Sequence, residues 1–347
     1  MRQRHKKQKN KVDIMKFVFL TDTHIKEKNP INRLDNYFET VINKIDEVAH
    51  FAVDNKVDFI VHGGDLFDTP TVSTICLVKF NRILFYLKEN NINFYVVSGN
   101  HDIYGRNPDT LPRTHLGLLE SFEAVEMLDR YNTVEERCSN GRTIKIVGTP
   151  YIYKMDGEDK KAYLLNYYEK DDNEFLINVV HGMLLEKPFI KEIEHTVVTD
   201  ILDTKADLTL SGHYHTGFGV IKLNGKTFLN PGSLTRCSNT TEEYKRMPQY
   251  ALIEINEDFK LDIKLIDVKC AKPGFEVLDR EYIEKHKNDK LEVLNFENTI
   301  REAANFDKYD YYSVLEEIIK SDNVEKAVID EAKKRLERAE EDIHGQD

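Results

Sequence analysis

The sequence predicts an α/β fold in which two β-sheets form a sandwich flanked by helices. Buried-strand patterns alternate with helical patterns over the first hundred residues, and short strand patterns joined by turns fill residues 219–268. The chain has 347 residues, of which 40% are hydrophobic and 32% are charged. This length and composition suit one large α/β domain with a smaller appendage.

The first hundred residues predict a repeated unit of strand, helix and strand. Residues 15–21 form a buried-strand pattern, and apolar side chains recur at helical spacing over residues 34–52. A second apolar run, residues 59–61, stops at two glycines. A helix over residues 75–87 then leads to a third strand at residues 92–97. Ligand sites in open α/β sheets lie beyond the carboxyl ends of the strands, so we expect the function there.

The rest of the chain adds further strands and then changes character. Strand patterns recur over residues 143–147, 175–180, 207–210, 219–223, 226–229, 250–255 and 261–268. The last four predict antiparallel strands joined by turns such as Asn224-Gly225. From residue 276 the sequence becomes charged and helical, with apolar stripes over residues 311–319 and 329–343.

Charge divides the chain into three regions. Residues 1–14 predict a basic tail, residues 15–275 the main domain, and residues 276–347 a smaller C-terminal helical or capping region. The tail has no apolar segment behind it, and no apolar run approaches the roughly 18 residues of a membrane span. We therefore expect a cytoplasmic protein with no membrane segment. The net charge of −12 argues against a free-standing nucleic-acid binder, although bound cations would offset it locally.

The cysteines give no sign of a disulfide framework or a structural zinc site. The chain has four, Cys76, Cys138, Cys237 and Cys270. They are widely scattered and include no C-x-x-C pair. We interpret all four as reduced thiols that serve in packing.

Nine polar side chains lie at the ends of five predicted strands. They are Asp22, His24, Asp65, Asn100, His101, Asp102, His181, His213 and His215. A single histidine or aspartate after a strand is usually solvated or part of a turn, but nine at neighbouring strand ends indicate one site. Carboxylate, carboxamide and imidazole ligands without thiolate favour Mn, Fe or Zn in a binuclear hydrolytic centre. The two oxygens of Asp65 would allow it to bridge two metals.

The motifs that carry these residues resemble those of the calcineurin-like metallophosphoesterases. They are Asp22-x-His24, Gly64-Asp65, Gly99-Asn100-His101-Asp102, His181-Gly182 and Gly212-His213-x-His215. The segment from Gly64 to Pro70, and an aspartate after Asn100-His101, further resemble the SbcD family of double-strand-break repair nucleases. The resemblance implies a four-layer metallophosphoesterase β-sandwich flanked by helices, with residues 15–275 as its catalytic domain.

The resemblance also implies roles for individual residues. It assigns one divalent cation to Asp22, His24, Asp65 and His215, and the other to Asp65, Asn100, His181 and His213. Both cations are expected to be Mn²⁺. His101 would act near the phosphate as an acid or transition-state donor, with Asp102 orienting its ring. We interpret His62 and Asp68 as structural, and Arg106, Arg113 and His115 as solvated loop residues within possible reach of phosphates.

The implied function is hydrolysis of DNA phosphodiester bonds, as exonuclease and endonuclease, by the nuclease subunit of an SbcCD-like complex. The expected partners are DNA and an SbcC-like coiled-coil ATPase, and a homodimer is also open. Three alternatives remain: a phosphoesterase for a small diester such as a cyclic nucleotide, a protein phosphatase, and a non-catalytic DNA-end-binding scaffold. The missing Arg-Gly motif disfavours the phosphatase, and the complete ligand set disfavours the scaffold.

Overall fold

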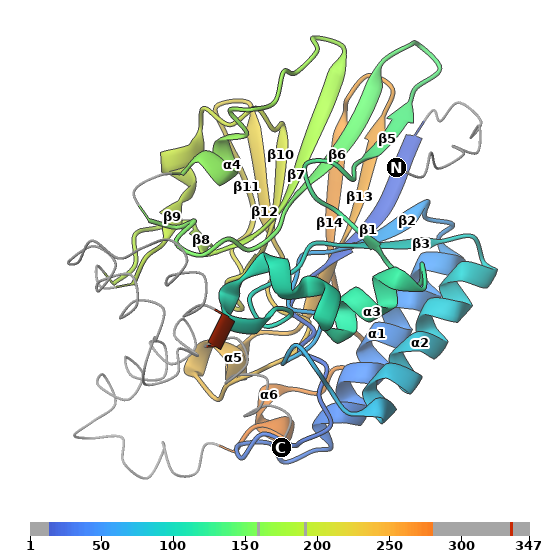
Figure 1. The fold of residues 1–347 in the computed structure, drawn as a ribbon, viewed down its shortest axis with the longest axis vertical. Coiled ribbons are helices and arrows are strands. Elements are labelled where there is room, and N and C mark those ends of the chain that lie inside the picture. The colour runs from blue at the N-terminus through green and yellow to red at the C-terminus, as the bar shows by residue number, and fades with distance from the viewer. Residues whose placement is uncertain (1–13, 158–159, 191–192, 280–333, 336–347) are drawn as a thin grey trace.

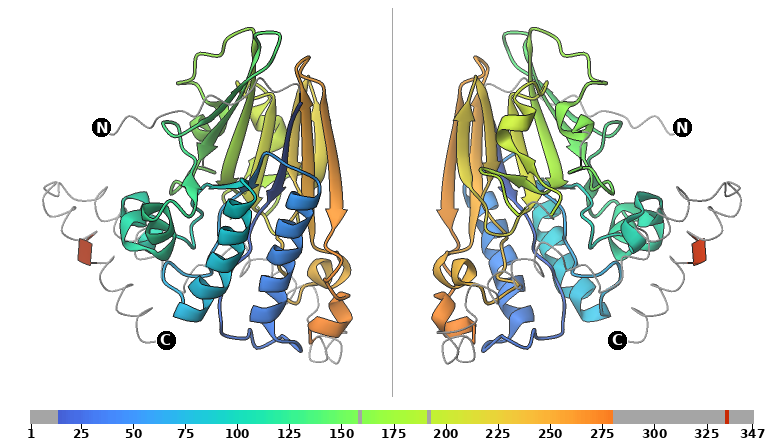
Figure 2. Two further views of the ribbon diagram at one scale, coloured as in Figure 1. Left: turned by 90° about the vertical axis from the view of Figure 1, so that its right-hand side faces the viewer. Right: turned by 90° about the vertical axis from the view of Figure 1, so that its left-hand side faces the viewer.

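Two six-stranded sheets pack face to face and form the body of the molecule. The computed structural model describes residues 14–157, 160–190, 193–279 and 334–335. Figures 1 and 2 show the sheets standing side by side, with the longest helices on one side and the short helix α4 (Lys161–Leu164) on the other. The architecture is therefore the expected α/β sandwich.

The first sheet has the strand order β14-β13-β1-β2-β3-β4. Its strands are β1 (Ile14–Leu20), β2 (Phe59–His62), β3 (Asn93–Val96), β4 (Glu126–Met127), β13 (Gln249–Asn256) and β14 (Leu261–Asp267). Strands β1 to β4 are parallel, whereas β13 pairs antiparallel with β1 and β14 pairs antiparallel with β13. The carboxyl ends of β1, β2 and β3 therefore meet at one edge of this sheet.

The second sheet has the strand order β11-β12-β10-β7-β6-β5. Its strands are β5 (Val134–Arg137), β6 (Thr143–Thr149), β7 (Glu174–Gly182), β10 (Leu208–His213), β11 (Gly219–Leu223) and β12 (Lys226–Asn230). The four inner strands are parallel, and the edge strands β5 and β11 are antiparallel to their neighbours. This sheet therefore has a carboxyl edge of its own.

Helices cover the outer face of the first sheet. They are α1 (Tyr37–Asp54), α2 (Thr74–Glu89) and α3 (His115–Ser121). Their apolar sides pack on alternate strand residues such as Val18, Ile60 and Phe94. The side chain of Asn36 accepts the backbone N–H of Glu39 and so caps the first turn of α1.

Shorter elements cover the outer face of the second sheet. They are α4, the strand pair β8 (Leu184–Leu185) and β9 (Thr196–Val197), and the 3₁₀ segment η3 (Val198–Ile201). Tyr163 of α4 packs with Val180 and Phe228 of the sheet. Four further short segments lie in connections: η1 (Tyr104–Arg106), η2 (Pro108–Arg113), α5 (Thr241–Lys245) and α6 (Gly274–Val277). The fold thus has four layers, as expected.

Side chains alternate between the core beneath the helices and the core between the sheets. In β1, Phe17 and Phe19 enter the core between the sheets, whereas Val18 and Leu20 face the helices. Phe17 also stacks on Phe59, with 5.2 Å between the ring centroids. Because both faces of the parallel strands are buried, their sequences read as nearly continuous apolar runs.

The predicted start of the first helix and two positions of the predicted apolar stripe of the second were wrong. Helix α1 begins at Tyr37, after its cap, and Leu34 lies outside it with 59% of its surface exposed. On α2, Ile75 and Val78 are also exposed, although the predicted apolar stripe included them. The buried stripe instead begins at Cys76 and continues through Phe80, because these residues face the sheet.

The main domain continues past residue 275, where the sequence placed its end. Val277 and Leu278 are buried, and the backbone N–H of Leu34 donates to the carbonyl of Val277 at 3.1 Å. The apolar stripes predicted over 311–319 and 329–343 lie outside the described residues, apart from Lys334 and Arg335. Among the described helices, none is long and apolar enough to cross a membrane.

Candidate metal centre

The carboxyl edges of the two sheets meet, and the predicted site residues gather where they meet. Asp22 follows β1 and Asp65 follows β2, whereas His181 and His213 lie in the last residues of β7 and β10. The ring nitrogen Nδ1 of His181 lies 2.8 Å from the carbonyl of Gly63, which joins the second sheet to the end of β2. The backbone N–H of His213 donates to both carboxylate oxygens of Asp22 at 3.1 Å. The site therefore spans both sheets.

The carboxylate of Asp65 lies at the centre of this group. Its Oδ1 accepts the backbone N–H of His101 at 2.9 Å, but its Oδ2 is buried without any hydrogen-bond donor. Oδ2 lies 3.3 Å from Nε2 of His181 and 3.7 Å from Nε2 of His24. A buried carboxylate oxygen without a partner is costly, and a cation shared with these imidazoles would satisfy it. The residues present therefore fit a bound metal.

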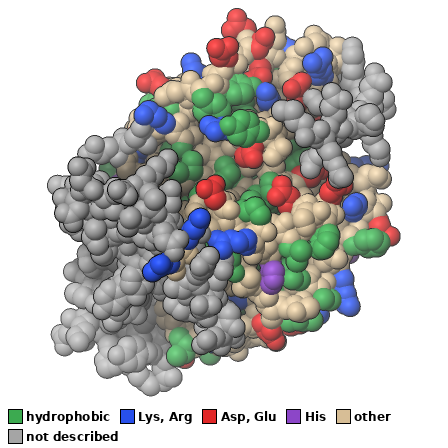
Figure 3. All heavy atoms as spheres, viewed as in Figure 1, with side chains coloured by type: hydrophobic (Ala, Val, Ile, Leu, Met, Phe, Trp, Pro, Cys, Tyr) green, Lys and Arg blue, Asp and Glu red, His purple; other side chains and the backbone are tan. Residues whose placement is uncertain are grey.

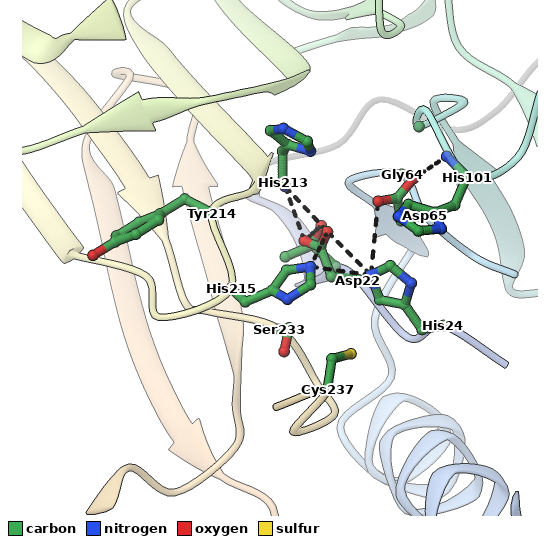
Figure 4. A network of polar contacts seen from close by, with 12 residues as sticks. Asp22, His24, Gly64, Asp65, His101, His213, Tyr214, His215, Ser233 and Cys237 are labelled. Atoms are coloured by element: carbon green, nitrogen blue, oxygen red, sulfur yellow. Dashed lines mark hydrogen bonds and ion pairs between the residues drawn. The ribbon is translucent and has the colours of Figure 1, made fainter. Parts of the chain in front are cut away.

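Four side chains form a first candidate metal position. Asp22, His24, Asp65 and His215 each offer a ligand atom, and these atoms lie within 4.8 Å of one another. Nε2 of His215 lies 3.1 Å from Nε2 of His24 and 3.6 Å from Oδ1 of Asp22. Figure 4 shows this group together with its ion-pair contacts. The sequence assigned the same four residues to one cation.

A second candidate position shares Asp65 with the first. Ligand atoms of Asp65, His181 and His213 lie within 4.8 Å of one another. Oδ1 of Asn100 is 3.2 Å from Nε2 of His181, which places the fourth predicted ligand beside them. Because Nδ1 of His181 faces a backbone carbonyl, the imidazole directs Nε2 toward the site.

Backbone strain marks the same residues. Asp22, His24, Asp65 and His213 all have positive φ, with values of 53°, 43°, 52° and 74°. Such conformations are costly for residues with a side chain and persist where the surrounding structure imposes them, often at functional sites. Four candidate ligands have positive φ, which indicates that the surrounding fold imposes this costly conformation in order to direct their side chains into the site.

Glycines let the backbone approach these ligands closely. A Cβ on Gly64, which has φ of 100°, would lie 2.3 Å from Nδ1 of His181. A Cβ on Gly99 would lie 2.0 Å from Oδ1 of Asp65. The glycines beside the predicted ligands are therefore needed for space as well as for turning the chain.

Electrostatics separates the histidines into two kinds. Burial lowers the pKa of His213 to about 3, with the neighbouring His181 acting in the same direction. Burial alone would also lower the pKa of His181, but the carboxylate of Asp65 outweighs it and raises that pKa to about 9. His181 in turn helps to hold the pKa of Asp65 well below its usual value despite burial. The positive charge of His181 stabilises the carboxylate of Asp65. A divalent cation would supply that charge instead, with His181 as a neutral ligand.

Asp68 has a larger part in the site than the sequence indicated. Its Oδ1 lies 3.3 Å from Nδ1 of His24, and its backbone carbonyl lies 2.7 Å from Nδ1 of His101. Lys26 forms an ion pair with the same carboxylate at 2.9 Å. Asp68 therefore holds two imidazoles of the site in position. The sequence indicated a structural role for Asp68 but did not indicate these contacts.

Asp102 does not orient the ring of His101, so this expected role was wrong. Its carboxylate accepts the backbone N–H groups of Leu66, Phe67 and Gly99 at 3.3, 3.0 and 2.9 Å. Burial, together with the charge of Asp65, raises the pKa of Asp102 to about 6. Asp102 thus ties the loop after β2 to the loop after β3, while the carbonyl of Asp68 orients His101.

Two histidines outside the ligand groups have structural contacts. His62 is fully buried, lies 3.2 Å from Oγ1 of Thr23, and has its pKa lowered to about 3 by burial and by His181. Nδ1 of His115 accepts the backbone N–H of Val72 at 2.9 Å, which ties α3 to the loop before α2. His62 is therefore structural, as interpreted, and His115 has a structural contact as well.

Comparison with known proteins identifies the family of this site. The family described as calcineurin-like phosphoesterase matches residues 15–217. The chain belongs to the calcineurin-like phosphoesterases. The matched residues contain the ends of β1, β2, β3, β7 and β10, so the candidate metal centre lies within the matched region. Family membership and the two ligand groups together imply bound divalent metals.

Relatives of this phosphoesterase carry a common name. A protein of Methanococcus maripaludis named "DNA double-strand break repair protein Mre11" is 25% identical over 341 residues, 95% of this chain and 85% of that protein. The protein of the same name from Methanosarcina mazei is 28% identical over 254 residues, 70% of this chain and 36% of that protein. The chain thus spans little more than a third of that second relative. A solved structure of a dimetal phosphatase from Danio rerio is 10% identical, and the match covers 74% of this chain and 99% of that chain with a TM-score of 0.43.

A buried segment supports the first metal position from below. Residues 233–237, which we term the cation-capped segment, present four consecutive carbonyls to cationic side chains. Arg246 donates to the carbonyls of Ser233 and Thr235, Lys44 to that of Leu234, and Arg33 to that of Arg236, at 2.7 to 3.2 Å.

The other side of this segment contacts the metal site. The backbone N–H of Ser233 donates to the carbonyl of His215 at 2.8 Å, and that of Leu234 to the carbonyl of Thr21 at 3.0 Å. The hydroxyl of Thr235 donates to the carbonyl of Asp22 at 3.4 Å. The cationic side chains therefore hold in place a segment that supports the backbone at Asp22 and His215.

The free energy of unfolding should depend on pH through Lys44, and Lys44→Met should remove that part of the dependence. Burial and the neighbouring Arg236, Arg246 and Arg33 lower its pKa from 10.5 to about 7 in the folded protein. Between these values the unfolded chain binds more protons, so the free energy of unfolding rises with pH, by up to about 1.4 kcal/mol per pH unit. Urea unfolding of metal-free protein at pH 7, 8 and 9 should show a smaller rise in the variant.

The exposed Lys222 provides the control for this measurement. Lys222→Met should keep the wild-type dependence on pH. An equal rise in wild type and Lys44→Met would mean that Lys44 stays protonated in the folded protein throughout this range.

Asp65→Asn should weaken both metal positions together. The substitution preserves the shape of the side chain and its acceptor for the N–H of His101, but removes the negative charge from Oδ2. Elemental analysis after equilibration with Mn²⁺ should find about two ions per wild-type chain and fewer than one per variant chain. Asp46→Asn, on the exposed side of α1, is the matched control and should retain both ions. Loss of a single ion in Asp65→Asn would exclude a bridging role.

Proposed function

We propose that the chain is a metal-dependent nuclease that hydrolyses DNA phosphodiester bonds, as exonuclease and endonuclease, in an SbcCD-like repair complex. The observation that carries the proposal is the convergence of two ligand groups on the unpartnered Oδ2 of Asp65. The relatives named as double-strand break repair proteins, one of them aligned over 95% of the chain, support DNA as the substrate. We propose Mn²⁺ for both positions, since the ligands are carboxylate, carboxamide and imidazole.

The proposed chemistry divides between the cations and the protein. Two bound cations would polarise the scissile phosphate and neutralise the charge that develops on it. Asp22, His24, Asp65 and His215 would hold one of them, and Asp65, Asn100, His181 and His213 the other. The buried contacts of Asp68 and Asp102 keep these ligands in place before the substrate arrives.

His101 is proposed to exchange a proton with the substrate. Its Nδ1 donates to the carbonyl of Asp68 at 2.7 Å, which fixes the tautomer and leaves Nε2 for the reacting phosphate. The ring also lies edge-on to His24, with 4.8 Å between centroids, so it borders the first metal position. In this neutral tautomer Nε2 can accept a proton, and in the imidazolium form it can donate one to a phosphate oxygen or to the leaving alcohol.

DNA must approach a protein of net charge −12. Figure 3 shows Lys and Arg side chains gathered near the middle of one face, over the segments that lie between β3 and α3 in Figure 1. Arg106 and Arg113 belong to these segments and lie over the rings of Tyr153 and Tyr104. We propose that this basic group and the bound cations attract the phosphate backbone locally.

The proposal extends to a partner. Residues 276–347 are proposed to bind an SbcC-like coiled-coil ATPase, although the part up to Leu278 packs on the catalytic domain. An ATPase that adds its own phosphate contacts would compensate for the acidic charge of the chain. Binding of DNA to the isolated chain should then be weaker and less dependent on salt than binding to the complex.

His101→Ala should lower turnover while leaving both metal ions bound. A positioned acid or base contributes roughly 10²–10⁴ in rate, and His101 belongs to neither proposed ligand set. The measurement is steady-state DNA cleavage in Mn²⁺, paired with elemental analysis of the same samples. His50→Ala, which removes an exposed histidine of α1, is the control and should cleave at the wild-type rate. Loss of metal in proportion to loss of rate would make His101 a ligand instead.

The substrate is tested by comparing catalytic efficiencies at fixed salt and Mn²⁺. We expect cleavage of duplex ends and DNA hairpins to exceed hydrolysis of cyclic nucleotides, because binding energy comes from an extended phosphate backbone. A chelator should abolish cleavage, and Mn²⁺ should restore it. Preference for a cyclic nucleotide, with no DNA cleavage even beside the ATPase, would contradict the nuclease and leave a phosphoesterase for small diesters.

A further inference from the structure

Cys237 places a thiol beside two of the proposed metal ligands. Its sulfur and a ring nitrogen from each of His24 and His215 lie within 4.8 Å of one another. Figure 4 shows Cys237 on the side of His215 that faces the cation-capped segment. The other cysteines differ, since Cys76 and Cys138 are buried packing residues and Cys270 is exposed. The sequence-based interpretation of Cys237 as a packing thiol therefore did not foresee its position beside His24 and His215.

The position of this thiol is fixed by its backbone. Cys237 ends the cation-capped segment, in which four consecutive carbonyls accept hydrogen bonds from Arg33, Lys44 and Arg246. Oγ1 of Thr235 lies 3.4 Å from the sulfur and 3.4 Å from the carbonyl of Asp22. A thiol on so constrained a segment stays near the two imidazoles without an entropic cost for ordering it.

The two imidazoles face each other at a distance that a shared proton or a bound cation would bridge. Nε2 of His24 and Nε2 of His215 approach each other to 3.1 Å, and the side chain of His24 is only 2% exposed. Two lone pairs at this distance repel, so either a proton or a cation must lie between them.

The donor set of the three residues differs from that of the catalytic positions. Two imidazole nitrogens and one thiolate sulfur suit Zn²⁺, which binds sulfur at about 2.3 Å and nitrogen at about 2.0–2.1 Å. Mn²⁺ and Mg²⁺ prefer oxygen and are poorly served by thiolate. The thiol releases its proton to solvent when it binds the cation, so affinity rises with pH.

We propose that His24, His215 and Cys237 form a zinc site that overlaps the first metal position. Zn²⁺ bound there occupies the imidazoles of His24 and His215, and competes with the cation that Asp22 and Asp65 share with them. The site makes the protein sensitive to thiophilic cations and to oxidation of the thiol. Inhibition of DNA cleavage by Zn²⁺ rests on the proposed function, whereas the binding of Zn²⁺ does not.

Cobalt provides a spectroscopic test that needs no substrate. Metal-free, reduced full-length protein is titrated with up to three equivalents of Co²⁺. We expect a near-ultraviolet thiolate-to-cobalt charge-transfer absorption, which Zn²⁺ removes by displacement. Cys237→Ser should lose the absorption, and Cys270→Ser, at the exposed cysteine, should retain it. Absorption that persists in Cys237→Ser, or is absent from the wild type, would overturn the proposal.

Alkylation of the wild type gives a second test that is independent of any variant. Iodoacetamide labelling followed by peptide mass spectrometry should show Cys237 protected by Zn²⁺ but not by Mn²⁺, with Cys270 labelled in both. Equal labelling of Cys237 with and without Zn²⁺ would contradict the site.

The two proposals can fail separately. Zn²⁺ should inhibit Mn²⁺-supported cleavage, and Cys237→Ser should raise the half-inhibitory Zn²⁺ concentration about tenfold or more, the scale of a lost metal contact. A cobalt signal without any DNA cleavage would sustain the zinc site and reject the nuclease. DNA cleavage without the cobalt signal would do the reverse.

Discussion

The constraint on which the site depends is the buried Oδ2 of Asp65, which no donor satisfies. The oxygen lies where the two sheets meet, 3.3 Å from an imidazole of the second sheet and 3.7 Å from one of the first. That convergence requires Gly64 and Gly99, because a Cβ at either position would collide with the ligands. It also requires positive φ at four candidate ligands, so the backbone is strained at the site. A cation bound there would reduce the repulsion between the buried carboxylates.

Around this centre the protein holds its ligands chiefly through backbone contacts. Asp102 accepts three backbone N–H groups, the carbonyl of Asp68 orients His101, and the cation-capped segment supports Asp22 and His215. Burying Lys44 for this purpose is costly, as its lowered pKa shows. Such a scaffold fixes geometry before substrate binds, which is what electrostatic stabilisation of a phosphoryl transition state requires.

The family defines the chemistry more closely than it defines the substrate. A binuclear centre of this kind can act on any phosphate ester that reaches it, so selection depends on the surface around it. Here the chain is acidic overall, and the Lys and Arg side chains near η1 and η2 are a local exception. We therefore propose that substrate choice depends on those segments and on the proposed partner rather than on the nine motif residues.

The sequence by itself determined the strands, the order of the motifs and the ligand candidates, because buried parallel strands leave apolar runs that end at the functional edge. It missed β4, β8 and β9, which have only two residues each and so carry no periodic signal. It also missed the edge strand β5, in which only Val134 is buried. Tertiary structure alone decided that Asp68 rather than Asp102 holds His101, and that Cys237 lies beside His24. Those contacts join loops far apart in the chain, and motif spacing records only position along the chain. Their geometry arises where the two sheets pack together.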